Sequence, residues 1–271
     1  MVSTLAIGSV LSMLVVSLAA ELPKSKSLLA RIVGGKEALL GDFPAIVAIT
    51  NAGNLTGGGI LLSERLVLTA GHCVDSRIPL RNLSIHVGSL NWRHGGIHVK
   101  VSSRNIHPDY HKPEFDNDIA LVHLASPIPK TPWVDFAQLP AAGSDVAPNS
   151  TIVAAGWGYT AARGVLSEKL LHTSFPLVSY SVCSSAYKQW NITVTENMLC
   201  GGTKQNAVCN GDSGGPWYDV ATKKLVGVTT WGFECSFLGH PGVALKLGNY
   251  IDWIEKHRKP PGNDTKGQGE F

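Results

Sequence analysis

Short runs of β-branched and other apolar residues, separated by glycine and proline, constrain the fold of this chain most strongly. Residues 45–49 (AIVAI) and 151–154 (TIVA) are two such runs. The 271 residues include 29 glycines and 15 prolines, residue types that end strands and form turns. This pattern predicts an all-β fold with many short strands. A hydrophobic content of 44% is enough for a sizeable core in one large or two small domains.

A serine lies between an acidic residue and two glycines in the segment 210–216 (NGDSGGP). A serine hydroxyl is a poor nucleophile unless a base and a site for negative charge activate it. The glycines permit a tight turn and close approach of a substrate, and the amides of Gly211 and Ser213 are candidates for binding an oxyanion. Ser213 is therefore the candidate nucleophile, although this segment alone would also fit an ordinary glycine-rich turn.

The partners that such a serine needs occur upstream, in the segments 69–73 (TAGHC) and 116–121 (DNDIAL). Both segments adjoin apolar runs that are typical of strands. His72 is the candidate base. Asp116 and Asp118 compete for the role of orienting it, and the order His, Asp, Ser is one of three in which this triad is found.

These motifs, together with Gly156-Trp157-Gly158 and Thr230-Trp231-Gly232, resemble the chymotrypsin/trypsin family of serine endopeptidases from Ile32 to about Arg258. The resemblance implies two six-stranded Greek-key β-barrels with the active site between them and a C-terminal α-helix. It also implies that Asp118 rather than Asp116 orients His72, and that no cofactor is needed.

The proline-rich segment 126–132 (SPIPKTP) is the expected linker between the barrels. It places the first barrel at 32–130 and the second barrel with its helix at 131–258, the helix itself beginning near residue 249. The polar tail 259–271 is predicted to be flexible.

Residues 1–20 contain an apolar stretch that is too short for a membrane span and fits a secretory signal. Residues 21–31 would then form a propeptide. Secretion is compatible with the sequons at Asn54, Asn82, Asn149, Asn191 and Asn263. The formal charge of +3 is too small to argue for nucleic acid or a membrane surface. We expect a secreted, extracellular, monomeric glycoprotein.

By resemblance, cutting after Arg31 frees the ammonium group of Ile32, which pairs with Asp212. A buried pair is strongly destabilised when one partner is missing, so the uncut chain would be an inactive zymogen. The alternative is that Arg31 is an ordinary basic residue in the N-terminal segment.

The resemblance pairs Cys183 with Cys200 and Cys209 with Cys235. Cys73 is left unpaired, because Thr56 stands where the family has its partner. We favour Cys73 as a small buried apolar residue. The alternative is a reactive thiol that makes the enzyme sensitive to mercurials or oxidation.

By resemblance, an apolar pocket binds the substrate side chain before the cut. Ala207 lies at its floor with Val208 beside it, and Gly232 and Gly242 leave its walls open. An uncharged floor gives lysine or arginine no ion partner, so we predict cleavage after Phe, Tyr or Leu. An extended substrate would pair with the backbone of Thr230, Trp231 and Gly232.

Other readings remain open. Glu234, beside Cys235, could attract cations at the pocket mouth, so trypsin-like or elastase-like specificity is an alternative. A second alternative is a non-catalytic secreted homologue that acts as a binding protein or inhibitor, although all three triad residues are present. The expected partners are protein or peptide substrates, protein protease inhibitors and a separate trypsin-like protease, since the pocket should reject Arg31.

No metal site is predicted. The spacing of His94 with His98 and of His107 with His111 resembles zinc pairs, but glycine or proline interrupts both. The stretch 81–101 contains no Asp or Glu, so no bound calcium is expected there.

Overall fold

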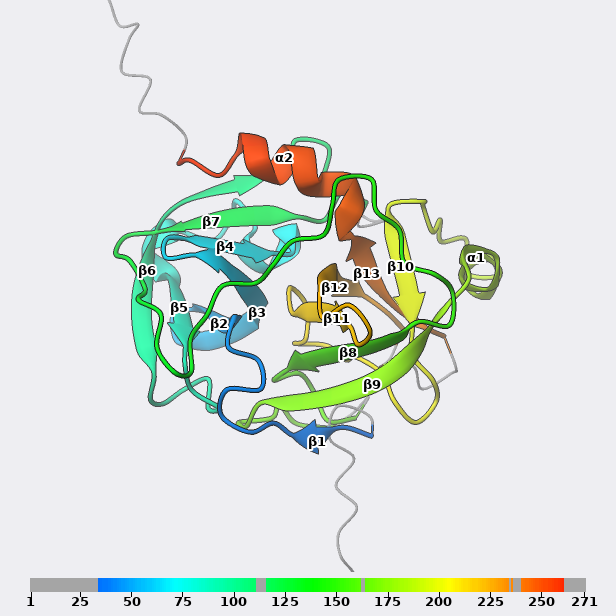
Figure 1. Ribbon diagram of the computed structural model, residues 1–271, viewed down its shortest axis with the longest axis horizontal. Helices are drawn as coiled ribbons and strands as arrows, with labels where there is room; N and C mark the ends of the chain where they lie inside the picture. The colour runs from blue at the N-terminus through cyan, green and yellow to red at the C-terminus, as the bar shows by residue number, and fades with distance from the viewer. Residues whose placement is uncertain (1–33, 111–115, 162–163, 234, 236–239, 261–271) are drawn as a thin grey trace, which may run out of the picture.

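The computed structural model describes residues 34–110, 116–161, 164–233, 235 and 240–260. Its strands gather into two barrels that lie side by side, with helix α2 (Ile251–Lys256) along the upper edge (Figure 1). Strand β1 (Lys36–Glu37) pairs with the second barrel before the chain enters the first.

The first barrel is closed and antiparallel, with the strand order β2-β3-β4-β7-β6-β5. Its strands are β2 (Ile46–Asn51), β3 (Asn54–Ser63), β4 (Leu66–Thr69), β5 (Leu83–Val87), β6 (Ile97–Ile106) and β7 (Ala120–Leu124).

The second barrel has the order β9-β10-β13-β12-β11-β8 and closes through pairing of β8 with β9. Its strands are β8 (Thr151–Gly156), β9 (Leu171–Val178), β10 (Met198–Gly201), β11 (Pro216–Asp219), β12 (Leu225–Trp231) and β13 (Gly242–Lys246). The prediction of an all-β fold with two six-stranded barrels is confirmed.

Two faces of the same strands are buried, which explains why the apolar runs are continuous rather than alternating. Leu61 points into the interior of the first barrel, where it belongs to a core with Val67. Its neighbour Ile60 faces the other way and belongs to a second core that β12, β13 and α2 share, as shown by Val228 and Ile254. This shared core fixes the two barrels against each other and so positions the cleft between them.

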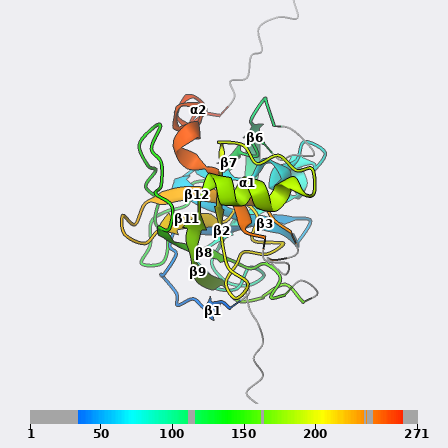
Figure 2. The same ribbon diagram turned by 90° about the vertical axis from the view of Figure 1, so that its right-hand side faces the viewer.

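The helical segments are short. Those that lie wholly within the described residues are η1 (Gly71–Val74), η2 (Leu80–Asn82), α1 (Tyr180–Lys188), η4 (Leu247–Tyr250) and α2. The helix predicted from about residue 249 is present, but its first turn is the 3₁₀ segment η4. Helix α1, on the face turned to the viewer in Figure 2, was not predicted; it begins at Tyr180 and is capped by Ser179, whose hydroxyl accepts a hydrogen bond from Val182 N.

The barrel boundary predicted at residue 130 falls between β7 and β8. The predicted signal and propeptide, residues 1–31, and residues 261–271 of the tail lie outside the described residues. In the part of the chain that the structure describes, no helix combines the length and apolar character needed to cross a bilayer.

Candidate active site

His72 and Asp118 are brought together by two neighbouring strands of the first barrel. His72 lies in η1, directly after β4, and Asp118 lies just before β7. Since β4 and β7 pair with Thr69 opposite Ala120, the two residues emerge at the same end of the barrel. Asp118 Oδ2 accepts a 2.7 Å hydrogen bond from His72 Nδ1, and Oδ1 accepts one of 2.9 Å from His72 N. Both carboxylate oxygens are therefore used on His72.

The surroundings of His72 favour its charged form. Burial of the ring lowers the pKa of His72, but charge and hydrogen bonding from Cys73 and Asp118 outweigh burial and raise it above its ordinary value. The Asp118 side chain is fully buried, whereas the His72 side chain is 23% exposed. The Nδ1 edge of the ring therefore bonds a buried carboxylate, and part of the ring is accessible from the cleft.

The competing residue Asp116 points elsewhere. Its Oδ1 accepts hydrogen bonds from Thr195 Oγ1 at 3.0 Å and Asn197 Nδ2 at 3.4 Å, both on the second barrel. Asn117, at a φ of 52°, accepts one at 3.0 Å from Tyr250 OH. The sequence did not predict these bonds. They attach the turn that contains Asp118 to the second barrel.

Ser213 lies on the second-barrel side of the cleft. Its hydroxyl donates to Thr230 O at 3.3 Å, and its carbonyl accepts from Gly58 N of the first barrel at 2.7 Å. Gly211 and Gly214 have φ values of 92° and 79°, which favour glycine. A Cβ at Gly214 would also collide with the carbonyl oxygen of Gly58.

Asp212 is buried beneath this turn. Its two oxygens accept hydrogen bonds from Gly158 N and Cys209 N, each at 2.8 Å. Burial raises the pKa of Asp212 to about 7, although both hydrogen bonds act to lower it. The predicted partner Ile32 and the cleavage residue Arg31 lie outside the described residues. The described chain starts at Gly34, packed against Gln205 and Asn206.

A cavity of about 260 Å³ opens beside His72 and Ser213. Of the predicted pocket residues it is lined by Val208, Thr230, Trp231, Gly232 and Gly242. Cys209 and Cys235, predicted to form a disulfide, also line it, and so do Asn210 and Thr229, which the sequence did not identify. Ala207, the predicted floor, is fully buried and does not line the cavity, and neither does Gly211.

The cavity is bounded by close backbone packing. A Cβ at Gly242 would lie 2.7 Å from Val208 Cγ2, and one at Gly232 would lie 3.4 Å from Gly242 Cα. Glycine at these two positions therefore leaves the space that a larger side chain would fill.

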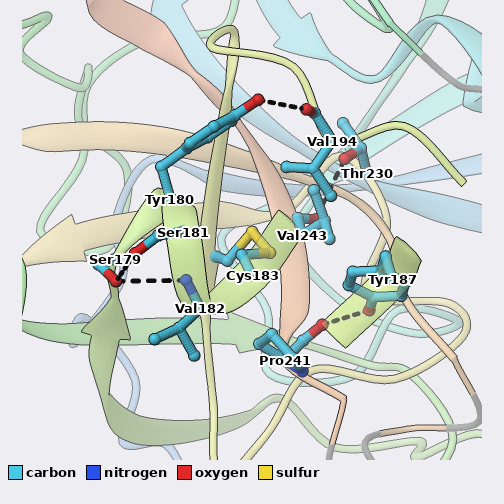
Figure 3. Close-up of a disulfide and its surroundings, with 11 residues drawn as sticks. Ser179, Tyr180, Ser181, Val182, Cys183, Tyr187, Val194, Thr230, Pro241 and Val243 are labelled. Carbon is cyan, nitrogen blue, oxygen red and sulfur yellow. Dashed lines mark hydrogen bonds between the residues drawn. A yellow bond between two sulfur atoms is a disulfide. The ribbon is translucent and has the colours of Figure 1, made fainter. Parts of the chain in front are cut away.

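Figure 3 shows the disulfide of helix α1 and its surroundings, which include Thr230, a residue that lines the cavity. Cys183 of α1 is bonded to Cys200 of β10. Tyr187, also of α1 and fully buried, donates its hydroxyl to Pro241 O, directly before Gly242. Thr230 Oγ1 donates to Val243 O at 3.1 Å, which joins the two strands that flank the cavity. A second disulfide joins Cys209 to Cys235.

Cys73 is a free, buried thiol. Its sulfur lies 3.6 Å from His72 Nε2 and donates to Ser213 O at 3.5 Å. Thr56, which replaces the family cysteine, instead donates its hydroxyl to Ile49 O at 3.1 Å. The missing partner was visible in the sequence, but the contact with the imidazole was not.

Comparison with known proteins agrees with this geometry. The family model described as Trypsin matches residues 32–254. The chain is 35% identical to "Trypsin" of Phaedon cochleariae over 229 residues, which cover 83% of this chain and 87% of the relative. It is 36% identical to "Trypsin, alkaline C" of Manduca sexta over 238 residues, 84% of this chain and 91% of the relative. The fold and these matches together show that the chain belongs to the trypsin family of serine endopeptidases.

Proposed function

We propose that Ser213, His72 and Asp118 form the catalytic triad of this endopeptidase. The bidentate contact of Asp118 with His72, in a cleft that also holds Ser213, is the observation that carries the proposal. Asp118 accepts the Nδ1 proton and so leaves Nε2 as the basic nitrogen of the neutral ring. His72 takes the Ser213 proton as Oγ attacks the peptide carbonyl, then gives it to the leaving amine. Water, deprotonated by the same nitrogen, hydrolyses the acyl-enzyme.

The amides of Gly211 and Ser213 would bind the negative oxygen that forms during attack. The positive φ of Gly211 supports this role, since it is a backbone conformation that L side chains rarely adopt. Fixed amide donors of this kind are usually the largest single contribution to stabilising such an intermediate.

The side chain before the scissile bond is proposed to be large and apolar. No Asp or Glu is among the described residues that line the cavity, and the residue beside its Val208 wall is Ala207. Burying an unpaired lysine or arginine charge there would cost several kcal/mol. Burying a Phe or Leu side chain gains roughly 1.5–3 kcal/mol.

Cleavage after basic residues is the second candidate, and two observations favour it. The relatives reported above are named trypsins. Glu234, which lies outside the described residues, is an acidic residue directly before Cys235 in the sequence, and Cys235 lines the cavity.

Peptide anilides ending in Phe, Leu, Ala or Arg distinguish the candidates. The chain should be treated with immobilised trypsin, which is then removed on its beads, and compared with Ser213→Ala treated in parallel. We expect Phe and Leu cleavage that appears after treatment and is absent from the variant. Preferential Arg cleavage would keep the triad and replace the apolar pocket by the second candidate. No turnover by protein cut after Arg31 would contradict the triad and leave a non-catalytic binding protein or inhibitor.

Secretion and zymogen activation complete the proposal. The apolar N-terminal stretch supports a secretory signal, and Arg31 followed by Ile32 supports activation by cutting between them. Since the proposed pocket rejects arginine, a separate trypsin-like protease would make this cut. Processing of pure, protease-free chain at Arg31 that Ser213→Ala abolishes would contradict that requirement.

A further inference from the structure

The proposed triad is divided between the two barrels, so its alignment depends on contacts that join them. Asp118 and His72 both belong to the first barrel, and both oxygens of the carboxylate bond His72. Ser213 belongs to the second barrel. A contact that holds the turn around Asp118 against the second barrel would therefore act on the alignment of base and nucleophile, although it touches neither.

Tyr250 makes such a contact from the second-barrel side. It is the last residue of η4, which follows β13, and it is 3% exposed. Its hydroxyl donates a 3.0 Å hydrogen bond to Oδ1 of Asn117, the residue directly before Asp118. Burial, together with the negative charges of Asp116 and Asp118, raises the pKa of Tyr250, so the hydroxyl keeps its proton at neutral pH and remains a donor.

Asn117 connects this hydrogen bond to the backbone of Asp118. Its Nδ2 donates to Asp109 O at 3.3 Å, so the side-chain amide is held at both ends. Its φ of 52° is a left-handed conformation in which asparagine is enriched. Its carbonyl accepts a 2.8 Å hydrogen bond from Ile119 N, which makes Asp118 the middle residue of a three-residue turn. Fixing Asn117 therefore fixes the backbone that carries the carboxylate.

We propose that Tyr250 is a positioning residue for catalysis that acts through Asn117 on Asp118. It holds the carboxylate, and with it the imidazole of His72, in line with Ser213. This role rests on the proposed triad. Tyr250 is not among the described residues that line the cavity, so removing its hydroxyl should slow the chemical step and leave substrate binding unchanged.

Tyr250→Phe keeps the ring in the core shared by the barrels and removes only the hydroxyl. The kcat of the trypsin-activated enzyme should fall about 2- to 10-fold, the effect on a rate of the net free energy of one hydrogen bond, while KM stays the same. Tyr180→Phe is the matched control, because it also removes one hydroxyl bonded to a carbonyl, that of Val194, and it should retain kcat. An unchanged kcat in Tyr250→Phe would overturn the proposal.

The pH profile separates positioning from a purely structural role. Burial lowers the pKa of His72, whereas the charge of Cys73 and the hydrogen bond with Asp118 raise it. If Tyr250→Phe displaces the carboxylate, that pKa should fall, and the acid limb of kcat/KM should move to lower pH. A lower Tm with the acid limb unmoved would show that Tyr250 only supports the fold.

A double variant tests whether Tyr250 acts through Asn117. Asn117→Gly removes the acceptor of the hydroxyl, and glycine still adopts the positive φ of this position. Once that acceptor is gone, adding Tyr250→Phe should reduce kcat no further, because residues that act as one unit are not additive. Losses that add in the double variant would contradict the path through Asn117.

An NMR measurement on trypsin-cut Ser213→Ala needs no turnover. The proton on His72 Nδ1, bonded to a buried carboxylate, should give a downfield resonance that Asp118→Asn removes and Tyr250→Phe shifts. Lack of turnover on every anilide by the unmodified enzyme, together with that shift, would contradict the triad and retain the positioning role. Full turnover with kcat and the resonance both unchanged in Tyr250→Phe would retain the triad and remove the positioning role.

Discussion

Asp118 and Asp116 are two residues apart, yet their carboxylates bind different groups. Asp118 is fully buried with both oxygens on His72, while Asp116 bonds Thr195 and Asn197 of the other barrel. This difference allows a matched pair of substitutions. Asp118→Asn removes an acceptor from His72 Nδ1 and favours the wrong tautomer, so kcat should fall about 10⁴-fold, as when the corresponding carboxylate of other serine proteases is changed to an amide.

Asp116→Asn is the control for that prediction. An amide oxygen can still accept from Thr195 and Asn197, so kcat should stay within a few-fold of the unmodified enzyme. Both rates should be measured on the same anilide after activation. A large loss for Asp116→Asn with little loss for Asp118→Asn would reverse the assignment.

Position 214 requires glycine for two reasons, its positive φ and the lack of space for a Cβ, and a comparison with Gly53 separates them. Its φ of 79° resembles that of Gly53 at 83°, but a Cβ at Gly53 meets nothing within 4 Å. Gly53→Ala should therefore cost only the backbone term, roughly 1–2 kcal/mol. Gly214→Ala adds a collision with Gly58 O and Thr69 Oγ1, typically worth about 1–3 kcal/mol more, and should also displace Ser213.

Urea unfolding and anilide turnover of both alanine variants check this prediction. Equal losses of unfolding free energy would show that the loop around Gly214 yields to the new methyl group. Retained turnover in Gly214→Ala would show that the substitution does not displace Ser213 enough to impair catalysis.

At the scale of elements, α1 and its disulfide are predicted to act on substrate binding. Tyr187 bonds the carbonyl before Gly242, whereas Tyr180, on the same helix and half-exposed, donates its hydroxyl to Val194 O away from the cavity (Figure 3). Tyr187→Phe leaves a buried carbonyl without its donor, at a cost of about 1–3 kcal/mol. If that cost falls on substrate binding at the pocket wall, KM should rise roughly 5- to 150-fold with kcat little changed.

Tyr180→Phe is the control, and its KM should not change. Equal KM changes in the two variants would indicate a general effect on the helix. An effect on thermal stability alone would indicate that α1 is a support for the fold and has no part in substrate binding.

The sequence predicted strands more reliably than helices for a physical reason. The apolar runs at 45–49 and 151–154 coincide with β2 and β8, because β-branched residues between turn residues are specific for strands. Helix α1 has an N-cap signal at Ser179, but its buried face consists of Cys183 and Tyr187 alone. Two buried positions are too few to show helical periodicity.

Contacts across the whole molecule were the least predictable. The motifs identified His72, Asp118 and Ser213, since each stands in a distinctive local segment. The bonds of Asp116 to the second barrel and the place of Asn210 on the cavity wall depend on how the barrels sit on their shared core. The proximity of Cys73 Sγ to His72 Nε2 depends on the side-chain geometry of η1, which no sequence spacing reports.

Asp212 connects the stability of the whole chain to pH. Burial raises its pKa from 3.8 to about 7 in the folded chain, so folding favours the protonated carboxyl. Its contribution to stability is present in full below about pH 4 and is lost as the pH rises through about 7, with each pKa unit worth about 1.4 kcal/mol. The uncut chain should therefore lose stability between about pH 4 and 8.

Cutting after Arg31 should remove this loss, because the ammonium of Ile32 would favour the ionised carboxylate and lower the pKa of Asp212. Thermal unfolding of Ser213→Ala, uncut and cut by trypsin, at pH 5 and pH 8 measures the difference without self-digestion. We expect cutting to raise Tm more at pH 8 than at pH 5, since only the ionised carboxylate gains from the new cation. In Ser213→Ala combined with Asp212→Asn that pH dependence should disappear. An equal effect of cutting at both pH values in the chain with Asp212 would contradict the pairing, and with it the physical basis of activation at this bond.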